Sequence, residues 1–423
     1  MPRALFCWEN GEGSGHVVPY LSLVEALIAR GWQVAVAAKN TAEVGARVQA
    51  SGALLLQAPV CVSLFADLDQ QSFSTTELLL QHGYGHAPTL DGIFSAWLGL
   101  MQVWQPDLVI GSGAPASHLA AQCLGIPDIA IGSGFNCPIA VNPAPLMRAW
   151  QPGVEQRISQ SEDRALQTIN AVMTMHGFAK RAFAMDMFFD VPQLLCTVAE
   201  LDHFSDFRKQ ADYLGMPPPT ASSSLPQSKS GNNGADAASA TAAPCDVFVY
   251  LRVNKSAEAL LASLAKLGVP TLAYIPGLTM TQRLKWEAAY SPAIKFSVGA
   301  VDIEKMLMRV RLVVSNAGHN LTLQTLLAGK PLLLFPNHWE QGVVAQRAAK
   351  IGAAIEVQGN DPHPKFRRWL DDLLNQPLHL QAAQRFAERY AQLSSQQSLE
   401  QAVSVCESRA FPQRGRAQLI SVR

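Results

Sequence analysis

The sequence lacks a surplus of charge of either sign. Lys plus Arg number 33 and Asp plus Glu also number 33, so the formal net charge at pH 7 is zero. Proteins that hold nucleic acid or anionic lipid by electrostatics present a strongly basic face, and this composition offers none. We therefore expect no nucleic acid among the partners.

Cysteine is scarce and scattered. The seven cysteines are odd in number, lie far apart and include no CxxC pair, whereas a disulfide framework or a zinc site needs paired residues at regular spacing. His82 and His86, in QHGYGH, have a spacing that metal ligands use, but no third ligand follows in a suitable run. The sequence thus predicts no metal site and a reducing, cytoplasmic location.

Long apolar runs are missing as well. No stretch reaches the roughly 18 uninterrupted apolar residues of a membrane-spanning helix. The first residues, MPRALFCW, carry one Arg and a very short apolar run, which is typical of a β-strand and not of a signal peptide. We expect no transmembrane segment.

The chain does contain enough apolar residues for two cores. It has 423 residues, of which 48% are hydrophobic, and this length exceeds one ordinary domain. Strand-like runs alternate with helical ones, and in the first helical run Val17, Leu21, Val24 and Ile28 form one apolar stripe. Continuous apolar strands between such helices indicate parallel sheets. The predicted fold class is α/β, with two Rossmann-like doubly wound domains.

A change of composition marks the boundary between the two domains. Residues 216–244 are dense in Pro, Ser, Gly and Ala and contain almost nothing that a core can bury, which predicts a disordered linker. We therefore predict an N-terminal domain over residues 1–215, a C-terminal domain over 245–407 and a tail over 408–423. Residues 364–407 are expected to be helical, and such a segment could pack back across both domains.

The stretch WENGEGSGHVVP, near the N-terminus, places glycines and a histidine between the first strand and the first helix. Such a bare turn lets a ligand approach main-chain N–H groups and a helix N-terminus. Gly13 and Gly15 precede His16, which lies at the mouth of this turn. A glycine turn of this kind, taken alone, is more often structural than functional.

The most informative stretch is VVSNAGHNLTLQTLLAGKPLLLFPNHWEQ, residues 313–341. A strand is expected to end at Ser315 and a helix to begin near His319, and the next strand is expected to end before NHWEQ. Both turns open at the carboxyl edge of a parallel sheet, where ligands of such folds bind. The free N–H groups of the helix start, with Asn320 and Thr322, would suit a diphosphate.

This arrangement resembles the donor site of nucleotide-sugar glycosyltransferases with the GT-B fold, the UDP-glycosyltransferase superfamily and its bacterial relatives. Their HGGxN[ST]xxE, GxP and P…[DE]Q elements recur here in the same order, and GSGHVVP is similar to their GHxxP element. The resemblance implies that residues 317–322 bind the diphosphate, that Glu340 and Gln341 hold the sugar, and that His16 is the base. The implied donor-binding residues are Ser315, Asn316, Ala317, Gly318, His319, Asn320, Thr322, Gln324, Glu340 and Gln341.

Three positions depart from the family pattern. Asn316 stands where the family usually has His, and Gln324 stands where it has a ribose-binding Glu. An amide keeps the hydrogen bonding of an acid but loses its charge, so the donor is left open between a UDP-sugar, a dTDP-sugar and another nucleotide-sugar. Ser112 occupies the position at which many relatives place the Asp that orients the histidine, and we include it with His16 as a catalytic candidate.

The resemblance implies two domains that face each other across a cleft and an inverting sugar transfer to a hydroxyl group. The acceptor, a small molecule, a lipid or a saccharide, is expected on the first domain. No cofactor is expected besides the nucleotide-sugar co-substrate. Two alternatives stay open: a nucleotide-sugar epimerase on the same fold, and a protein that binds a nucleotide-sugar and transfers nothing.

Overall fold

The computed structural model describes residues 1–11, 13–62, 65, 68, 72–146, 153–220, 245–253, 255–299, 301–358 and 365–412. The chain divides into two compact units. Unit 1 holds the described residues before 221 and after 393, and unit 2 holds those between. Of the predicted linker, residues 221–244 lie outside the described part, so the structure does not bear on that prediction.

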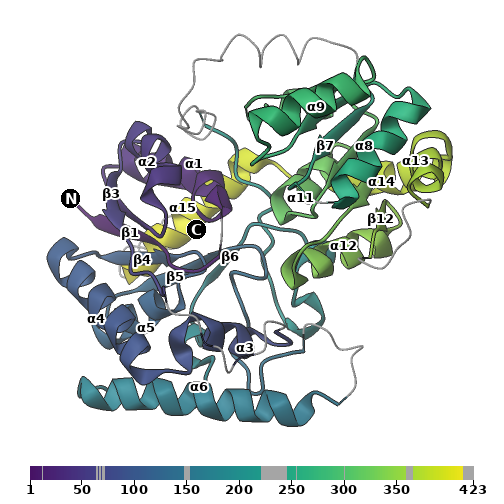
Figure 1. Ribbon diagram of the computed structural model, residues 1–423. Helices are drawn as coiled ribbons and strands as arrows, with labels where there is room; N and C mark the ends of the chain where they lie inside the picture. Colours follow the sequence, from purple (N-terminus) through teal and green to yellow (C-terminus); the bar gives the residue numbers. More distant parts are fainter. Residues whose placement is uncertain are drawn as a thin grey trace. The chain divides into compact units, whose positions relative to one another are not determined.

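Unit 1 is built on a six-stranded sheet in the order β3-β2-β1-β4-β5-β6, and its neighbouring strands are parallel (Figure 1). This order is that of a doubly wound sheet, in which the chain first moves outward in one direction and then in the other. The strands are β1 (Arg3–Trp8), β2 (Gln33–Ala38), β3 (Leu54–Gln57), β4 (Leu108–Gly111), β5 (Asp128–Gly132) and β6 (Gln193–Leu195).

Helices cover both faces of this sheet, because alternate strand residues point to opposite sides. Ala4, Phe6 and Trp8 of β1 enter one core cluster, and Leu5 and Cys7 enter the other. The helical elements of unit 1 are η1 (Ser14–His16), η2 (Val18–Tyr20), α1 (Leu21–Ala29), α2 (Thr41–Ala50), α3 (Thr75–Leu79), η3 (Leu80–Tyr84), α4 (Ala87–Trp104), α5 (Pro115–Cys123), α6 (Glu155–Met175), η4 (Asp186–Phe188), η5 (Ala199–Leu201), η6 (Ser205–Phe207) and α15 (Ser395–Ala410).

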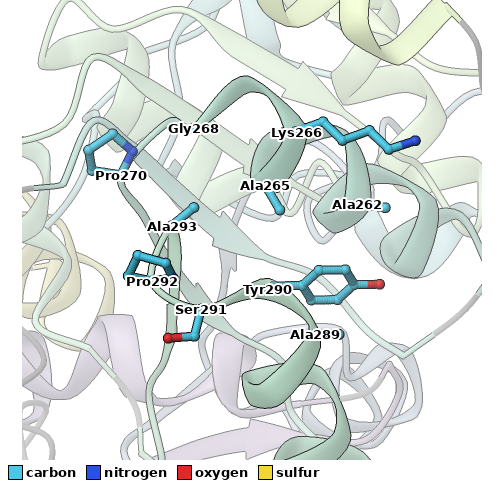
Figure 2. Close-up of a pocket in the computed structure, with 10 residues that line it drawn as sticks. All are labelled: Ala262, Ala265, Lys266, Gly268, Pro270, Ala289, Tyr290, Ser291, Pro292 and Ala293. Carbon is cyan, nitrogen blue, oxygen red and sulfur yellow. The ribbon is translucent and has the colours of Figure 1, made fainter.

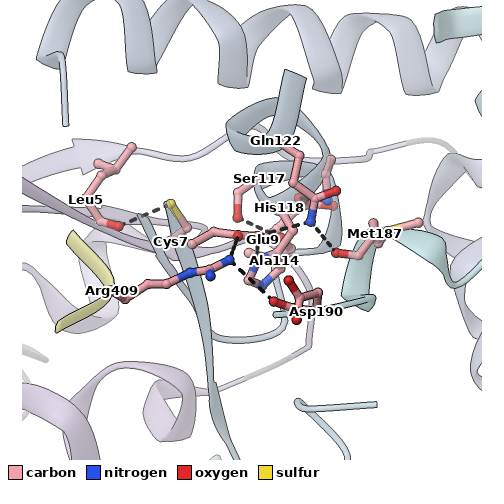
Figure 3. A network of polar contacts seen from close by, with 12 residues as sticks. Leu5, Cys7, Glu9, Ala114, Ser117, His118, Gln122, Met187, Asp190 and Arg409 are labelled. Carbon is pink, nitrogen blue, oxygen red and sulfur yellow. Dashed lines mark hydrogen bonds and ion pairs between the residues drawn. The ribbon is translucent and has the colours of Figure 1, made fainter. Parts of the chain in front are cut away.

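The last helix, α15, belongs to unit 1, although it follows unit 2 in the sequence. Its residues Leu399, Val403 and Cys406 join the core cluster that contains α1. Arg409, near its end, donates to the Asp190 carbonyl at 3.3 Å (Figure 3). The predicted C-terminal domain over 245–407 is therefore corrected at its end, because the apolar side of α15 is buried in unit 1 from residue 394 onward.

Unit 2 repeats the doubly wound plan. Its sheet has the order β12-β11-β10-β7-β8-β9, again with parallel neighbours. Val247 and Val249 of the central strand are buried against helices α8 and α13, and Phe248 is buried on the opposite face. The strands are β7 (Val247–Tyr250), β8 (Thr271–Tyr274), β9 (Ile294–Phe296), β10 (Leu312–Ser315), β11 (Leu332–Leu334) and β12 (Ala354–Glu356).

The helices of unit 2 connect these strands and close its end. Among the residues that the structure describes in either unit, no helix is long and apolar enough to cross a bilayer. The helices are α8 (Lys255–Leu267), α9 (Met280–Tyr290), α10 (Ile303–Leu307), α11 (His319–Leu327), α12 (Trp339–Ile351), α13 (Lys365–Asn375) and α14 (Pro377–Arg389).

Each sheet has one switch point, where the strand order reverses. In unit 1 it lies between β1 and β4, and in unit 2 between β7 and β10. Ligands of doubly wound folds bind at the carboxyl ends of the strands beside such a point, because the two following loops diverge there. The loop with His16 follows β1, and the turn before α11 follows β10. The predicted α/β class with two Rossmann-like units is confirmed, and both candidate sites lie at switch points.

Candidate functional site

His16 lies in a slot at the switch point of unit 1. It ends η1, and its imidazole stacks on the indole of Trp8, with ring centroids 5.6 Å apart and an interplanar angle of 8°. A Cβ added to Gly11 would lie 2.2 Å from His16 Nε2, and one added to Gly113 would lie 3.1 Å from Nδ1. Both glycines also have a positive φ, 85° and 59°. The imidazole therefore occupies a space that only glycine leaves open at these two positions.

The glycines that make room for His16 are not the two that the sequence singled out. Gly13 has a φ of 79°, which favours glycine, but a Cβ there would meet nothing within 4 Å. Gly15 is exposed. Gly13 shapes the turn through its positive φ, whereas the close approach to the ring depends on Gly11 and Gly113. Gly113 follows another strand, so the local glycine pattern did not reveal it.

Burial keeps the imidazole of His16 neutral. Its pKa is lowered from 6.5 to about 4, first by desolvation and then by the positive charge of Lys39. Lys39, next to the end of β2, donates from Nζ to the Gly11 carbonyl at 3.1 Å. Nδ1 of His16 is buried and has no hydrogen-bond partner among the described residues. A neutral imidazole with an unused nitrogen is able to accept a proton, although a pKa near 4 makes it a weak base.

Ser112 makes no hydrogen bond to His16 among the described residues. It follows β4, is fully buried, and donates from its backbone N–H to the Cys7 carbonyl at 2.9 Å. Its Oγ has no hydrogen-bond partner in the described part of the chain. The residue lies on the loop beside the slot, and no hydrogen bond among the described residues joins it to the imidazole. Its predicted catalytic role stays a prediction.

Glu9 is a site residue that the sequence reasoning missed. It follows Trp8 directly and is only 2% exposed. Its Oε2 accepts hydrogen bonds from Trp97 Nε1 at 2.9 Å and from the Ala116 N–H at 3.1 Å. Burial raises the pKa of Glu9 to about 7. An acidic residue next to a buried strand end was the available signal. Trp97 itself is fully buried and belongs to the core of the unit.

The turn between β10 and α11 forms the candidate site of unit 2. Ala317 has a φ of 59°, and its N–H donates to Ser315 Oγ at 3.2 Å. Gly318 is the N-cap of α11 and provides no side-chain cap. The first N–H groups of α11 therefore receive no side-chain acceptor from the N-cap, and this helix end favours an anion.

Side chains of the first turns of α11 add polar groups to this helix start. Thr322 is fully buried, and its Oγ1 has no hydrogen-bond partner among the described residues. Nδ1 of His319 lies 3.2 Å from Asn320 Oδ1. Gln324 is partly buried, one turn further along. The structure thus places four residues that are predicted to bind the nucleotide-sugar on one short helix. Among them, the buried Thr322 hydroxyl makes no hydrogen bond to the described residues.

Asn316 is occupied by the protein itself. Its Oδ1 accepts from the Arg252 N–H at 2.9 Å, and its Nδ2 donates to the Phe335 carbonyl at 2.8 Å. Arg252 follows β7 and Phe335 follows β11, so this amide ties the ends of three adjacent strands together. These two hydrogen bonds brace the three strand ends, and the predicted contact of Asn316 with the donor stays a prediction.

Glu340 and Gln341 lie in the first turn of α12, at the same edge of the sheet. Gln341 Oε1 accepts from the Asn337 N–H at 2.9 Å, so its oxygen holds the preceding loop. Glu340 is partly buried, and burial alone raises its pKa to about 7. A carboxyl group near neutrality is able to accept or donate a hydrogen bond to a hydroxyl. Among the described residues, no hydrogen bond engages the carboxyl group of Glu340, whereas Gln341 is already bonded to Asn337.

An open hollow of about 650 Å³ lies elsewhere on unit 2 (Figure 2). It is formed where α8 and α9 end and lead into β8 and β9, which is the amino edge of the sheet. Ligands of doubly wound folds bind at the other edge. The hollow is therefore separate from the turn before α11. Its lining includes Ala265, Lys266, Pro270, Tyr290 and Pro292.

Comparison with known proteins shows the fold. No protein-family model and no curated protein sequence matches the chain. Among solved structures, glycosyltransferase VinC in complex with dTDP is 18% identical, with a TM-score of 0.66 over 96% of this chain and 99% of VinC. The spinosyn rhamnosyltransferase SpnG, complexed with spinosyn aglycone, is 16% identical, with a TM-score of 0.65 over 96% of this chain and 100% of SpnG.

A third similar structure is glycosyltransferase SnogD from Streptomyces nogalater. It is 16% identical, with a TM-score of 0.60 over 96% of this chain and 100% of SnogD. In each case nearly the whole of both chains is covered. The chain therefore has the two-domain GT-B fold of these glycosyltransferases.

Proposed function

We propose that the protein is a glycosyltransferase that moves a sugar from a nucleoside diphosphate sugar to a hydroxyl group of a small-molecule, lipid or saccharide acceptor. Unit 2 binds the donor and unit 1 binds the acceptor. The donor is a dTDP- or UDP-sugar. The proposal includes no cofactor and no metal ion, and the backbone N–H groups at the start of α11 stabilise the diphosphate by hydrogen bonds.

The observation that carries this proposal is the start of α11. Its N–H groups receive no side-chain cap at a switch point, and the buried Thr322 hydroxyl beside them is unused by the described residues. A polar atom buried without a partner costs free energy unless a ligand engages it. A diphosphate provides acceptor oxygens for both kinds of donor. Glu340, which follows the next strand at the same edge, is then available to a sugar hydroxyl.

The similar structures support the ligand classes. VinC holds dTDP, and SpnG holds an aglycone in a rhamnosyltransferase. Both likenesses extend over almost the whole chain, so both units have a counterpart in these enzymes. We therefore favour dTDP-sugars first among donors, and hydroxylated aglycones first among acceptors.

In the proposed reaction His16 acts as general base. An unused imidazole nitrogen takes the proton of the acceptor hydroxyl, the oxygen attacks the anomeric carbon, and the bond to the diphosphate breaks. A single displacement of this kind inverts the anomeric configuration. The negative charge that develops on the leaving diphosphate is stabilised by the α11 N-terminus. The proton ends on His16 and the electron pair ends on the nucleoside diphosphate.

A second candidate is a protein that binds a nucleotide-sugar without transferring it. The observation in its favour is the environment of His16, whose pKa is lowered to about 4 and which has no orienting hydrogen bond in the described part of the chain. A base held in this way needs help from the substrate or works slowly. We favour sugar transfer over binding alone, because glycine at positions 11 and 113 leaves the space that the His16 imidazole occupies.

The test measures nucleotide release and binding on the same samples. dTDP- and UDP-sugars are incubated with and without an acceptor library, and products are identified by mass spectrometry. We expect acceptor-dependent release that His16→Ala abolishes, with donor affinity unchanged within about threefold. Binding without release would support the second candidate, and sugar isomerisation without release would indicate an epimerase. Absence of nucleotide binding would overturn the proposal.

We also propose that the enzyme works in the cytoplasm. All seven cysteines are free, and free thiols persist in a reducing compartment. Fractionation of the producing cells with an antibody against the chain tests this, and recovery outside the cytoplasmic fraction would contradict it.

A further inference from the structure

Glu9 and Trp8 are adjacent in the sequence, but their side chains serve opposite faces of the sheet. Trp8 enters the core cluster shared with α1 and carries the His16 ring on its indole. Glu9 reaches the other face, where it contacts Trp97 of α4 and Ala116 of α5. Figure 3 shows the Glu9 carboxyl group beside the start of α5, close to Ala114 and Ser117. Glu9 thus connects the loop after β1 to two helices.

The loop between β4 and α5 forms the other side of the connection. It contributes Gly113, whose added Cβ would lie 3.1 Å from His16 Nδ1. Its backbone is tied to the loop after β1 by a hydrogen bond from the Asn10 N–H to the Gly113 carbonyl at 2.8 Å. Immediately after this loop, the Ala116 N–H donates to Glu9. The Glu9 carboxyl group therefore holds the start of α5, which directly follows Gly113 and the loop beside the His16 ring.

A carboxylate suits this place for an electrostatic reason. Ala116 is in the first turn of α5, where unsatisfied N–H groups favour negative charge. The remaining Glu9 oxygen, Oε1, lies 3.4 Å from Asn10 Nδ2. An apolar side chain would leave the Trp97 and Ala116 donors buried and unpaired, which is costly. No other described acidic side chain reaches the Ala116 N–H.

We propose that Glu9 is a positioning residue for His16, which fixes the α5 start and the Gly113 backbone so that the imidazole stays between Trp8 and Gly113. The test of this proposal by enzyme activity rests on the proposed transfer function, but its test by the titration of His16 does not. Glu9 touches neither the imidazole nor a reacting atom, and it acts through the loop after β4.

The surroundings of Glu9 allow its own protonation to be followed as a second measurement. The titratable groups that face it are the Cys7 thiol on β1 and the Tyr84 hydroxyl on η3, and burial raises the pKa of both. The Cys7 thiol and the Tyr84 hydroxyl therefore stay neutral at pH 7. The other groups around Glu9, which are the indole of Trp97, the amide of Asn10 and the α5 backbone, carry no charge either. Glu9 is then the group of this cluster that titrates near neutrality, since burial raises its pKa to about 7.

The experiment compares Glu9→Ala and Glu9→Gln by NMR of the His16 imidazole, which is assigned by its loss in His16→Ala. Glu9→Ala removes the acceptor for Ala116, so the slot loosens and water reaches the ring. We expect the pKa of His16 to rise from about 4 toward 6.5. Glu9→Gln keeps one acceptor oxygen, so we expect a smaller rise in the pKa of His16. Because the titrating carboxyl group is gone, the His16 signals should also lose the step near pH 7 that the protonation of Glu9 causes.

A matched control is Glu162→Gln. Glu162 is also a buried carboxyl group with a raised pKa, and it accepts from a backbone N–H, that of Ala144 at 3.0 Å. It lies on α6 and makes no described contact with the loops around His16. We expect this variant to lose stability without any change in the His16 titration. An equal change in both variants would mean a general loosening and would overturn the proposal.

Activity gives an independent readout. For Glu9→Ala we expect kcat to fall about 10- to 100-fold, with the donor KM changed less than threefold, because the base is misplaced and unit 2 is untouched. A folded Glu9→Ala protein with an unchanged His16 titration overturns the positioning role, whatever its activity. An inactive wild-type protein with a shifted His16 titration in Glu9→Ala would instead contradict the transfer function and leave the positioning role supported.

Discussion

The imidazole of His16 lies parallel to the indole of Trp8, with ring centroids 5.6 Å apart and 8° between the planes. Trp8 ends β1 and His16 closes the loop that follows, so the stack joins the two ends of one short segment. The stack removes one face of the imidazole from water, and this loss of solvation disfavours the charged form. Burial, to which this stack contributes, is the main cause of the low pKa of His16, about 4, and the positive charge of Lys39 is the second cause.

The slot around His16 is tested by Gly113→Ala. Gly113 has a φ of 59°, and a new Cβ would lie 3.1 Å from His16 Nδ1 and 3.3 Å from the Asn10 carbonyl. We expect transfer to fall at least tenfold and stability to fall by about 1–2 kcal/mol. Gly177→Ala is the control, because Gly177 has a φ of 71° with nothing within 4 Å of the added Cβ. It should lose similar stability in urea denaturation and keep full activity, and equal activity losses would contradict the slot.

Ser112→Asp is expected to raise the pKa of His16. Ser112 is fully buried on the loop beside the slot, and a carboxylate there favours the protonated imidazole. The NMR titration of His16 should move from about 4 toward 6.5, and the transfer rate should rise. Burial of the new, unpaired charge should cost about 3–5 kcal/mol of stability. Ser112→Asn keeps the size without the charge, so it should leave the titration in place. A titration unchanged in folded Ser112→Asp would refute the electrostatic argument.

Thr322→Val is expected to separate ligand binding from stability. The Thr322 hydroxyl is buried without a partner among the described residues, so its removal should leave the free protein equally stable or more stable by up to about 1 kcal/mol. The Kd of dTDP should rise about 5- to 10-fold by calorimetry, which corresponds to one lost hydrogen bond.

Thr325→Val supplies the control for that change. Thr325 lies on the same helix and is also buried, but its Oγ1 donates to the Leu321 carbonyl at 2.7 Å. This variant should leave the Kd of dTDP unchanged. If the two substitutions weaken dTDP binding equally, the Thr322 hydroxyl is not a ligand for the diphosphate.

Glu340 predicts a pH dependence of donor recognition. Burial raises its pKa to about 7, so the carboxylate form, the stronger acceptor for sugar hydroxyls, dominates above that pH. Affinity for the nucleotide-sugar should be constant at higher pH and should fall as the pH drops through about 7. Affinity for free dTDP, which has no sugar to contact Glu340, should lack this step. Glu340→Gln should remove it, and a step that persists in this variant would point to another group.

Several features of the fold could be predicted because they depend on local pattern. The apolar runs that become β1 and β10 are continuous, since both faces of each sheet are covered. The stretch from Ser315 to Gln341 also carries its strand–turn–helix arrangement within a short span, so its place at a carboxyl edge could be inferred. The apolar stripe of the first helical run begins at Val17, whereas α1 begins at Leu21 after the short turns η1 and η2.

Other features depend on residues that are distant in the sequence. Asn316 and Gln341 are predicted ligand contacts, and the structure adds that each amide is hydrogen-bonded to the backbone of a neighbouring loop. A motif gives the residue type and the spacing. It does not give the hydrogen-bond partners, because these come from strands and loops brought together by the sheet.

The sequence by itself determined the alternation of strands and helices, the two doubly wound units and the position of a donor-like turn, since each depends on periodicity and short-range residue types. Only the tertiary structure decided that α15 returns to unit 1, that Gly113 and Trp8 enclose His16, and that Glu9 holds the start of α5. The physical reason is that burial and hydrogen bonding are properties of a place in space. The loop after β1 and the loop after β4 are about a hundred residues apart in the chain, and the sheet sets them side by side.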